Sequence, residues 1–546
     1  MSIDAAAALE ETVPGATLAR GAATIAVITV AARVAGLART VVLAHTVGPS
    51  FLGNTYATAN TVPNVIFEIV AGGALASAVV PMLAGPLARG DRRQASATAS
   101  ALLSWCVVVL VPVAAVGAVA RTAVMHALVG DVSDAAVRAR EVALGSRMLL
   151  VFMPQVVLYG VGIVLTGVLH AHRRFAAPAI APLLSSLVVI SAYLAFAGQD
   201  TGHGLEVSRA AELTLSVGTT AGVAALTLSL LVPTFRLRLR LRPTLHMPPG
   251  TASGIRLLAA AGASALVAQQ LALVVVLRLA NPLPGGVIVY QVAYTVFLLP
   301  WAVLAVPIAT SAFPRLAAAT ATGDADTYRA TARPAAVGVL VTTSCAAAIL
   351  IATAAPASRL LLGVQHLPGV AAADELRRAI VTFAPGLPGY GLVALLTRAL
   401  YARHGARAAA VSTVVGFGVV AVADVVAVFV MPSGWRVAAL GVGNTMGMTT
   451  AGVLLLLATT RRTPGLWPIA SARAVAALPV ALLAGVGAGY EASSAVVSDG
   501  RGADVLGVVA GAVASVAVGI GVALAAGVLD VAGLRAHARH VVGRRG

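Results

Sequence analysis

The chain contains no lysine and only 20 acidic residues, so all 37 of its basic residues are arginine. The absence of lysine excludes a phosphate-binding loop of the Walker A type, which ends in a lysine. ATP bound by this chain is therefore not the expected energy source. The arginines lie in short stretches between apolar blocks and form no aromatic-basic face, which argues against nucleic acid as a partner.

Cysteine and the usual catalytic motifs are also scarce. Cys106 and Cys345 lie inside apolar blocks without metal-ligand spacing, and nothing indicates a disulfide framework. The sequence has no HExxH motif, and His170 and His172 lie in a basic stretch that is typical of solvated side chains. We expect no catalytic residue, no metal and no cofactor, and we do not expect an enzyme.

Charged residues make up only 10% of the chain, whereas hydrophobic residues make up 59% and the mean hydropathy is +0.94. A soluble domain carries about 25% charged residues. The apolar residues form repeated blocks long enough to cross a bilayer as helices. Lipid-facing backbone must form its hydrogen bonds internally, and the blocks lack barrel-like alternation. The sequence therefore predicts an all-α polytopic membrane protein.

The apolar blocks predict about fourteen transmembrane helices, and no cleaved signal peptide is expected because the N-terminal segment is acidic rather than basic. The expected ranges are 22–47, 57–85, 97–120, 147–170, 176–198, 210–233, 254–280, 287–313, 333–355, 378–402, 408–431, 436–459, 467–489 and 504–529.

The loops between these blocks alternate in charge. Even-numbered loops are basic, as in Arg89 to Arg93 and Arg236 to Arg242, and so is the tail from Arg535 to Arg545. Odd-numbered loops are neutral or acidic, apart from the mixed third and ninth. Because basic loops stay on the cytoplasmic side, this pattern predicts cytoplasmic N- and C-termini.

Two stretches, 165–175 and 396–405, each lead from an apolar helix through a short basic loop into another apolar helix, which indicates an internal repeat. We expect two six-helix lobes with a substrate site between them, followed by two C-terminal helices. The expected parts are a cytoplasmic tail (1–21), an N-terminal lobe (22–235), a basic cytoplasmic linker (236–253), a C-terminal lobe (254–460), two additional helices (461–530) and a basic cytoplasmic tail (531–546).

The linker contains the alternating run Arg236-Leu-Arg-Leu-Arg-Leu-Arg242. Two interpretations remain open. The arginines contact anionic lipid headgroups of the inner leaflet, or the run only sets the topology of the chain.

The stretch Ala32-Arg-Val-Ala-Gly-Leu-Ala-Arg39 resembles the first span of the MurJ/MviN lipid II flippases, relatives of multidrug (MATE) and polysaccharide exporters. The resemblance continues through Gly48, Asn54, Val62-Pro-Asn64, Gly73-Ala74 and Val80-Pro81, and recurs at Arg174-Phe175, Pro178, Pro182 and Arg398 to Arg403. It implies a bacterial inner-membrane protein that moves a polyprenyl-pyrophosphate-linked peptidoglycan precursor to the outer leaflet by alternating access. The last two helices would hold the lipid tail.

The chain departs from that family at three cavity positions. Asn54 stands where the family usually carries an acid, and Phe67, beside Glu68, stands where it carries an arginine. Thr295 corresponds to an arginine on the eighth span. Some of the pyrophosphate-binding arginines that the resemblance implies are thus missing, which leaves open a paralogue that handles a different polyprenyl-linked glycan.

Arg33 and Arg39 lie within the first expected span, where a charge costs at least ~2.5 kcal/mol unless it has a partner or a watery cavity. They are six residues apart, about 240° around a helix, so they share no face but can both border a wide cavity. There they would bind pyrophosphate. Alternatively, Arg33 pairs with Glu68 and Arg39 extends toward the headgroups. Glu68 itself is either a proton-coupling carboxylate or only the partner of Arg33.

The expected substrate-binding residues lie on the spans that would border the cavity or, for Asn54, in the first loop: Arg33, Arg39, Asn54, Asn64, Glu68 and Thr295. A second candidate site lies in the C-terminal lobe, where Asp424 has no charged neighbour in sequence. Some family members bind sodium there, and Asp424 with Asn444 or Thr449 would couple transport to a monovalent cation or a proton gradient. A hard cation prefers about six oxygens, so the alternative is a buried polar contact.

Three functions remain in competition. The first is a flippase for lipid II or a related polyprenyl-linked glycan, with anionic lipids as further partners. The second is a MATE-like exporter of small amphiphilic cations, whose cavity should contain acids. The third is a membrane scaffold for cell-wall synthesis proteins that transports nothing.

Overall fold

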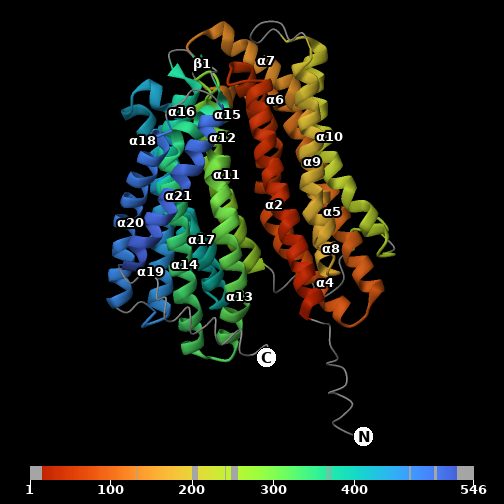
Figure 1. The fold of residues 1–546 in the computed structure, drawn as a ribbon. Coiled ribbons are helices and arrows are strands. Elements are labelled where there is room, and N and C mark those ends of the chain that lie inside the picture. Colours follow the sequence, from red (N-terminus) through yellow and green to blue (C-terminus); the bar gives the residue numbers. More distant parts are fainter. Residues whose placement is uncertain are drawn as a thin grey trace.

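The computed structural model describes residues 15–130, 132–199, 207–239, 241–246, 256–363, 366–367, 370–466, 469–496 and 501–525. Helices that run up and down the molecule form two lobes, with the N-terminal lobe in red to yellow and the C-terminal lobe in green to blue (Figure 1). Within the described residues, twelve helices are long and apolar enough to cross a membrane. The other two expected spans coincide with α3–η2–α4 and with α20.

The N-terminal lobe is built from consecutive helices joined by short loops. They are α2 (Gly15–Thr46), α3 (Phe51–Phe67), the π-helical turn η2 (Glu68–Gly72), α4 (Gly73–Ala88), α5 (Arg92–Val119), α6 (Arg121–Val129), α7 (Ala135–Phe152), α8 (Gln155–Ala171), α9 (Ala176–Ala197) and α10 (Arg209–Phe235).

The C-terminal lobe repeats this order, and two further helices follow it. Its elements are α11 (Arg256–Ala280), α12 (Gly286–Pro300), the π-helical turn η3 (Trp301–Ala305), α13 (Val306–Ala321), α14 (Ala325–Ala352), α15 (Ala354–Leu362), β1 (His366–Leu367), β2 (Val370–Ala371), α16 (Ala372–Phe383), η4 (Ala384–Gly386), α17 (Leu387–Ala402), α18 (Ala406–Val430), η5 (Ser433–Trp435), α19 (Arg436–Arg462), α20 (Ile469–Ser494) and α21 (Arg501–Ala525).

Matching irregularities confirm the predicted internal repeat. The second helix of each lobe contains a π-helical turn, η2 or η3, and each turn follows a proline, Pro63 or Pro300. A short helix follows the third long helix of each lobe, α6 or α15. The fourth long helix of each lobe is interrupted, at Pro154 and at Ala384–Gly386. Proline removes a backbone donor, so it favours such breaks.

Several boundaries differ from those expected from hydropathy. Helix α2 begins at Gly15, inside the segment expected to be a tail, and α7 begins at Ala135, well before the expected start of the fourth span. The short helices α6 and α15 and the two-residue strands β1 and β2 lie in stretches expected to be loops. The expected tail at 531–546 lies outside the described residues.

Two names for the ends of the molecule are used below. The arginine-rich end holds the loops around Arg89, Arg174, Arg236 and Arg403, and the sealed end holds the loops around Pro49, Asn281 and Trp435. Helix α2 begins at the arginine-rich end (Figure 1).

Glycines bring α18 and α19 into close contact. Gly443 and Gly447 of α19 lie directly against Asp424 and Val420 of α18, and Gly416 of α18 lies against Ala451. Small residues let membrane helices approach until dispersion contacts hold them together, because lipid offers no hydrophobic drive for helix pairing. This packing holds α18 and α19 together within the C-terminal lobe.

Replacing Gly447 by alanine should lower the stability of the protein. The added Cβ would lie 2.6 Å from the backbone oxygen of Gly416 and 2.9 Å from the backbone nitrogen of Val420. Overpacking of this kind costs about 1–3 kcal/mol. The control is Gly418→Ala, because a Cβ there meets nothing within 4 Å and alanine is the better helix former. The Tm of the two variants in detergent is the measurement, and equal values would contradict the packing argument.

Candidate functional site

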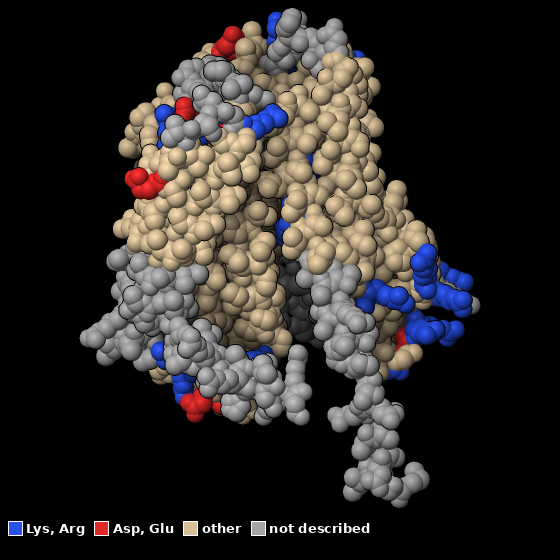
Figure 2. Space-filling view, in the orientation of Figure 1, with Lys and Arg blue, Asp and Glu red and all other residues tan. Residues whose placement is uncertain are grey.

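A cavity of about 660 Å³ lies between the two lobes. Its walls come from α2, α8, α9 and α10 of the N-terminal lobe and from α12 and η3 of the C-terminal lobe. Figure 2 shows the surface hollowed between the lobes, with arginine atoms visible in the hollow. The cavity reaches the arginine-rich end at His170 and Phe175. Its lining is therefore supplied by both halves of the repeat, as expected for a transporter.

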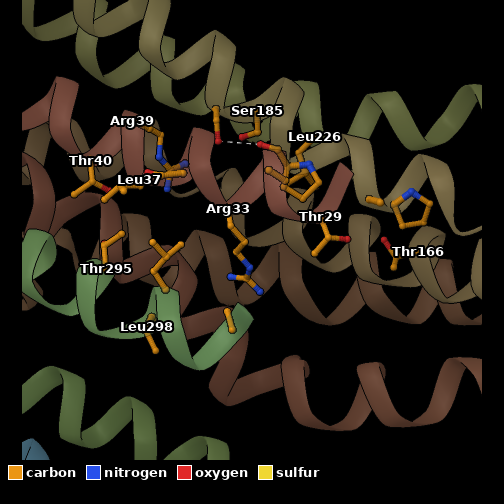
Figure 3. A pocket seen from close by; sticks show the side chains of 18 of the residues that line it. Thr29, Arg33, Leu37, Arg39, Thr40, Thr166, Ser185, Leu226, Thr295 and Leu298 are labelled. Carbon is orange, nitrogen blue, oxygen red and sulfur yellow. Dashed lines mark hydrogen bonds between the residues drawn. The ribbon is translucent and has the colours of Figure 1, made fainter. Parts of the chain in front are cut away.

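Arg33 and Arg39 both line this cavity (Figure 3). They do not share one narrow face of α2, but both lie on the broad side of the helix that lines the cavity, together with Thr29, Gly36 and Thr40. Only 11% of the apolar window of α2 is buried inside the protein, so much of the helix surface is open. The guanidinium of Arg33 extends toward α12, which carries Thr295 and Leu298 (Figure 3). Two positive charges from one helix thus reach the same space.

Neither arginine is neutralised by the protein. Among the described residues, Arg33 and Arg39 form no ion pair and no side-chain hydrogen bond, and Glu68 does not pair with Arg33. The described residues that line the cavity include no aspartate or glutamate. The remaining polar groups of the lining are hydroxyls and one imidazole: Thr29, Thr40, Thr166, Ser185, Ser186, Thr295 and His170.

This chemistry suits an anion that carries both phosphate and hydroxyl groups. A guanidinium matches phosphate oxygens with two parallel N–H donors, and the hydroxyls both donate and accept hydrogen bonds. On the C-terminal lobe, Thr295 contributes a short polar side chain to the lining. Its hydroxyl donates to the backbone oxygen of Gln291 at 2.7 Å. The opposite wall therefore adds no charge at this position.

Asn64 and Glu68 lie outside the cavity lining. The backbone oxygen of Asn64 accepts the N–H of Glu68, at the point where α3 passes into the π-helical turn η2. Phe67 is buried and its ring lies 5.8 Å from that of Tyr159, in the interior of the N-terminal lobe. The structure thus associates this segment with the bend in the second helix rather than with the cavity wall.

Asn54 also lies outside the cavity, in a hydrogen-bond network that joins the lobes at the sealed end. Its side-chain nitrogen donates to Asn281 O at 3.1 Å and to Leu283 O at 2.7 Å, and its side-chain oxygen accepts from Val287 N at 2.9 Å. An aspartate could accept the last bond, but its carboxylate could not donate the first two. An asparagine at this position therefore satisfies three backbone groups of the other lobe.

Asn281 completes this network, which we call the asparagine seam (Asn54, Thr58 and Asn281). Asn281 exchanges hydrogen bonds with Thr58 at 3.0 and 3.2 Å and donates to Leu128 O at 3.0 Å. Gly285, at φ +76°, ends the same loop, and a Cβ there would overlap the backbone of Pro49. The seam closes the cavity at this end.

The second candidate site is only partly assembled. Asp424 is fully buried on α18, and neither of its carboxylate oxygens has a hydrogen-bond partner among the described residues. The side-chain nitrogen of Asn444 and the side-chain oxygen of Gln270 are likewise buried and unpartnered. Thr449, in contrast, is exposed and lies six residues beyond Gly443, about 240° around α19 from the face that contacts Asp424.

Within the described residues, no group of three His, Cys, Asp or Glu side chains is arranged to hold a metal. An unpartnered buried carboxylate is unstable as a bare charge, so Asp424 needs a proton or a cation. The sequence singled out Asp424 and, on the seventh expected span, the adjacent glutamines Gln269 and Gln270, and the structure shows that the side-chain oxygen of Gln270 is the buried, unpartnered one.

Comparison with known proteins identifies the family. The sequence model of the lipid II flippase MurJ family matches residues 43–498. The chain belongs to the lipid II flippase MurJ family. The family relative from Burkholderia cenocepacia, a lipid II flippase MurJ, is 29% identical over 178 residues, which are 32% of this chain and 33% of the relative. That alignment therefore spans about a third of the relative's length.

Solved structures confirm the predicted all-helical transporter fold. A lipid II flippase MurJ in an inward closed conformation matches with a TM-score of 0.70, covering 92% of this chain and 98% of that one at 15% identity. An inward-facing MATE family multidrug transporter matches with a TM-score of 0.66, covering 81% and 98% at 14% identity. At such identities the likeness establishes the fold of this multi-pass membrane protein and not its substrate.

Proposed function

We propose that this member of the MurJ family moves a polyprenyl-pyrophosphate-linked cell-wall precursor, lipid II or a related lipid-linked glycan, from the inner to the outer leaflet. The observation that carries the proposal is the pair Arg33 and Arg39, which have no ion-pair partner among the described residues, in a cavity whose described lining contains no acid. A pyrophosphate supplies the counter-charge that these guanidinium groups lack. The lining hydroxyls supply partners for the sugar.

The same observation disfavours the MATE-like alternative. A carrier of amphiphilic cations stabilises its substrate with carboxylates, and two guanidinium groups would repel it. The structural likeness to MATE transporters therefore reflects the shared fold, while the charge of the cavity separates the two substrate classes. Scaffolding alone gives no reason for two charges in an accessible cavity at membrane depth.

The arrangement of the two ends supports alternating access as the proposed mechanism. The basic loops predict that the arginine-rich end faces the cytoplasm of the bacterial cell, and the cavity reaches that end. The asparagine seam closes the other end. The precursor would enter from the inner leaflet, and the seam would then separate to release it on the outer side.

Asp424 is our candidate for coupling transport to an ion gradient. It is buried, has no hydrogen-bond partner among the described residues and packs directly against Gly443 of α19, so loading and unloading of a proton or a monovalent cation would change the packing of α18 on α19. Coupling of this kind needs no site on the cavity wall.

Replacing Arg33 or Arg39 by alanine should reduce transport of a polyprenyl-pyrophosphate-linked glycan in proteoliposomes by about tenfold or more, and the double variant should be inactive. Hydrogen bonds to charged groups contribute about 1.5–3 kcal/mol each, which sets this scale. The control is Arg315→Ala, an exposed arginine outside the cavity, with a change of less than about twofold. Full activity of both single variants would favour the scaffold hypothesis.

Replacing Asn54 by alanine should shift the protein toward a state that is open at the sealed end, because three hydrogen bonds between the lobes are lost. Spin labels on cysteines at Ala136 and Ser433, exposed positions on the two lobes at that end, report the separation by double electron–electron resonance. We expect a new population at longer distance. Gln94→Ala, at the other end, serves as the control, and an unchanged distance distribution in Asn54→Ala would exclude the seam as the closure.

Replacing Asp424 by asparagine should abolish the acceleration of transport by an imposed sodium or pH gradient while leaving transport without a gradient within about threefold. Asparagine keeps the shape of the side chain but cannot carry the charge that binds a proton or cation. Asp134→Asn is the matched control, since asparagine caps α7 as well as aspartate does. A gradient response that survives in Asp424→Asn rules out this residue as the coupling site.

A further inference from the structure

The linker between the lobes is fixed on the surface of α5. The backbone N–H of Arg242 donates to Ser100 Oγ at 3.0 Å, and that of Thr244 donates to Ser104 Oγ at 3.0 Å. The indole N–H of Trp105 donates to Leu245 O at 3.0 Å. A connection that only bridged the lobes would not need these three bonds, so the linker is held in a defined position on the N-terminal lobe.

The alternating sequence of the linker separates its two kinds of side chain. Leu237, Leu239 and Leu241 are half-buried and pack against the hydrophobic core. Arg236, Arg238 and Arg242 are exposed. Residues 236–238 form a turn, with Arg238 at φ 55°, and the chain continues without regular structure at Leu241 and Arg242. The half-buried leucines therefore anchor the segment, while the exposed arginines stay accessible.

A second arginine cluster lies at the same side of the molecule. Arg89 lies in the turn before α5, Arg92 and Arg93 begin α5, and all three are exposed. Figure 2 shows arginine side chains gathered at the lower right of the molecule. We call these six arginines the linker patch. The one acid in the described residues of these two segments is Asp91, whose carboxylate caps α5 by accepting from Gln94 N at 2.8 Å. Six positive charges thus face one negative charge.

The surface next to the linker patch is apolar. On α5, Trp105, Val108 and Val111 are 42%, 49% and 47% exposed. On α10, Val232 and Phe235 are 57% and 66% exposed. Both helices pack on α8, where Gly160 contacts Cys106 and Gly162 contacts Thr227. A basic surface that continues into exposed apolar helix faces, with a tryptophan at the boundary, has the profile of a membrane interface.

We propose that the linker patch binds the headgroup of an anionic diacyl phospholipid, whose acyl chains lie along the exposed faces of α5 and α10. Guanidinium groups bind phosphate oxygens bidentately, and several of them together select a lipid with net negative charge over a zwitterionic one. The site is separate from the cavity, and the inference does not rest on the transported substrate. Of the two interpretations of the run Arg236 to Arg242, the proposal favours contact with lipid headgroups over a role in topology alone.

Native mass spectrometry of the full-length protein in detergent, titrated with phosphatidylglycerol or phosphatidylcholine, tests this proposal. The triple variant R236Q/R238Q/R242Q should bind phosphatidylglycerol about 30-fold more weakly and phosphatidylcholine unchanged. R236K/R238K/R242K, which keeps the charge, should stay within about threefold of the parent. The matched control R315Q/R407Q/R461Q removes three exposed arginines of the C-terminal lobe at the same end and should change the affinity by less than about twofold.

Three results would overturn the proposal: equal losses in the linker and control variants, equal affinity of the parent for the two lipids, or displacement of phosphatidylglycerol by millimolar inorganic phosphate. Should the glutamine triple variant not fold, the three single glutamine variants replace it. Each is expected to weaken phosphatidylglycerol binding about threefold, and unchanged binding in all three would equally refute the assignment.

Discussion

The cost of a charge inside a membrane is the constraint on which this structure depends. Arg33 and Arg39 lie on a helix that would otherwise expose them to hydrocarbon, where an arginine costs at least ~2.5 kcal/mol. The described residues offer them no carboxylate, so the cost is met by the cavity that both arginines border. Keeping that cavity open requires space between α2, α9 and α12, although the lobes also contact each other away from the sealed end, where α11 lies against η2 and α4.

The groups that join the lobes at the sealed end are uncharged, which affects how easily the lobes can separate. The asparagine seam consists of amide, hydroxyl and backbone groups, which exchange protein partners for water at a net cost of about 1 kcal/mol per bond. A buried ion pair in the same place would leave two costly charges when it broke. A seam of neutral hydrogen bonds is strong enough to close the end of the cavity and weak enough to open repeatedly.

Hydropathy and charge predicted the helices, the repeat and the two cavity arginines, because each of these depends on the chain's local composition. The contacts between residues on different helices could not be predicted in the same way. Asn54 was assigned to substrate on the basis of family resemblance, but its partners are backbone groups more than 200 positions away. Asp424 and Thr449 were assigned to one site because they lie on expected spans eleven and twelve. Thr449, however, lies on a different face of α19 from the one that contacts Asp424. The π-helical turns and the short helices α6 and α15 carry no hydropathy signal of their own.

Under the proposed function, an anionic precursor must be distinguished from the bulk anionic lipids that surround it, and both carry phosphate. Arg33 and Arg39 are six residues apart, about 9 Å along the axis of α2. Their long side chains can converge on two linked phosphates, whereas a single phosphodiester engages one guanidinium and leaves the other without a counter-charge. Because an unpaired charge at membrane depth is the costly state, the pair penalises the wrong lipid as well as stabilising the right one. The free-energy cost of an unpaired arginine at membrane depth would then account both for the open cavity and for the preference for a pyrophosphate.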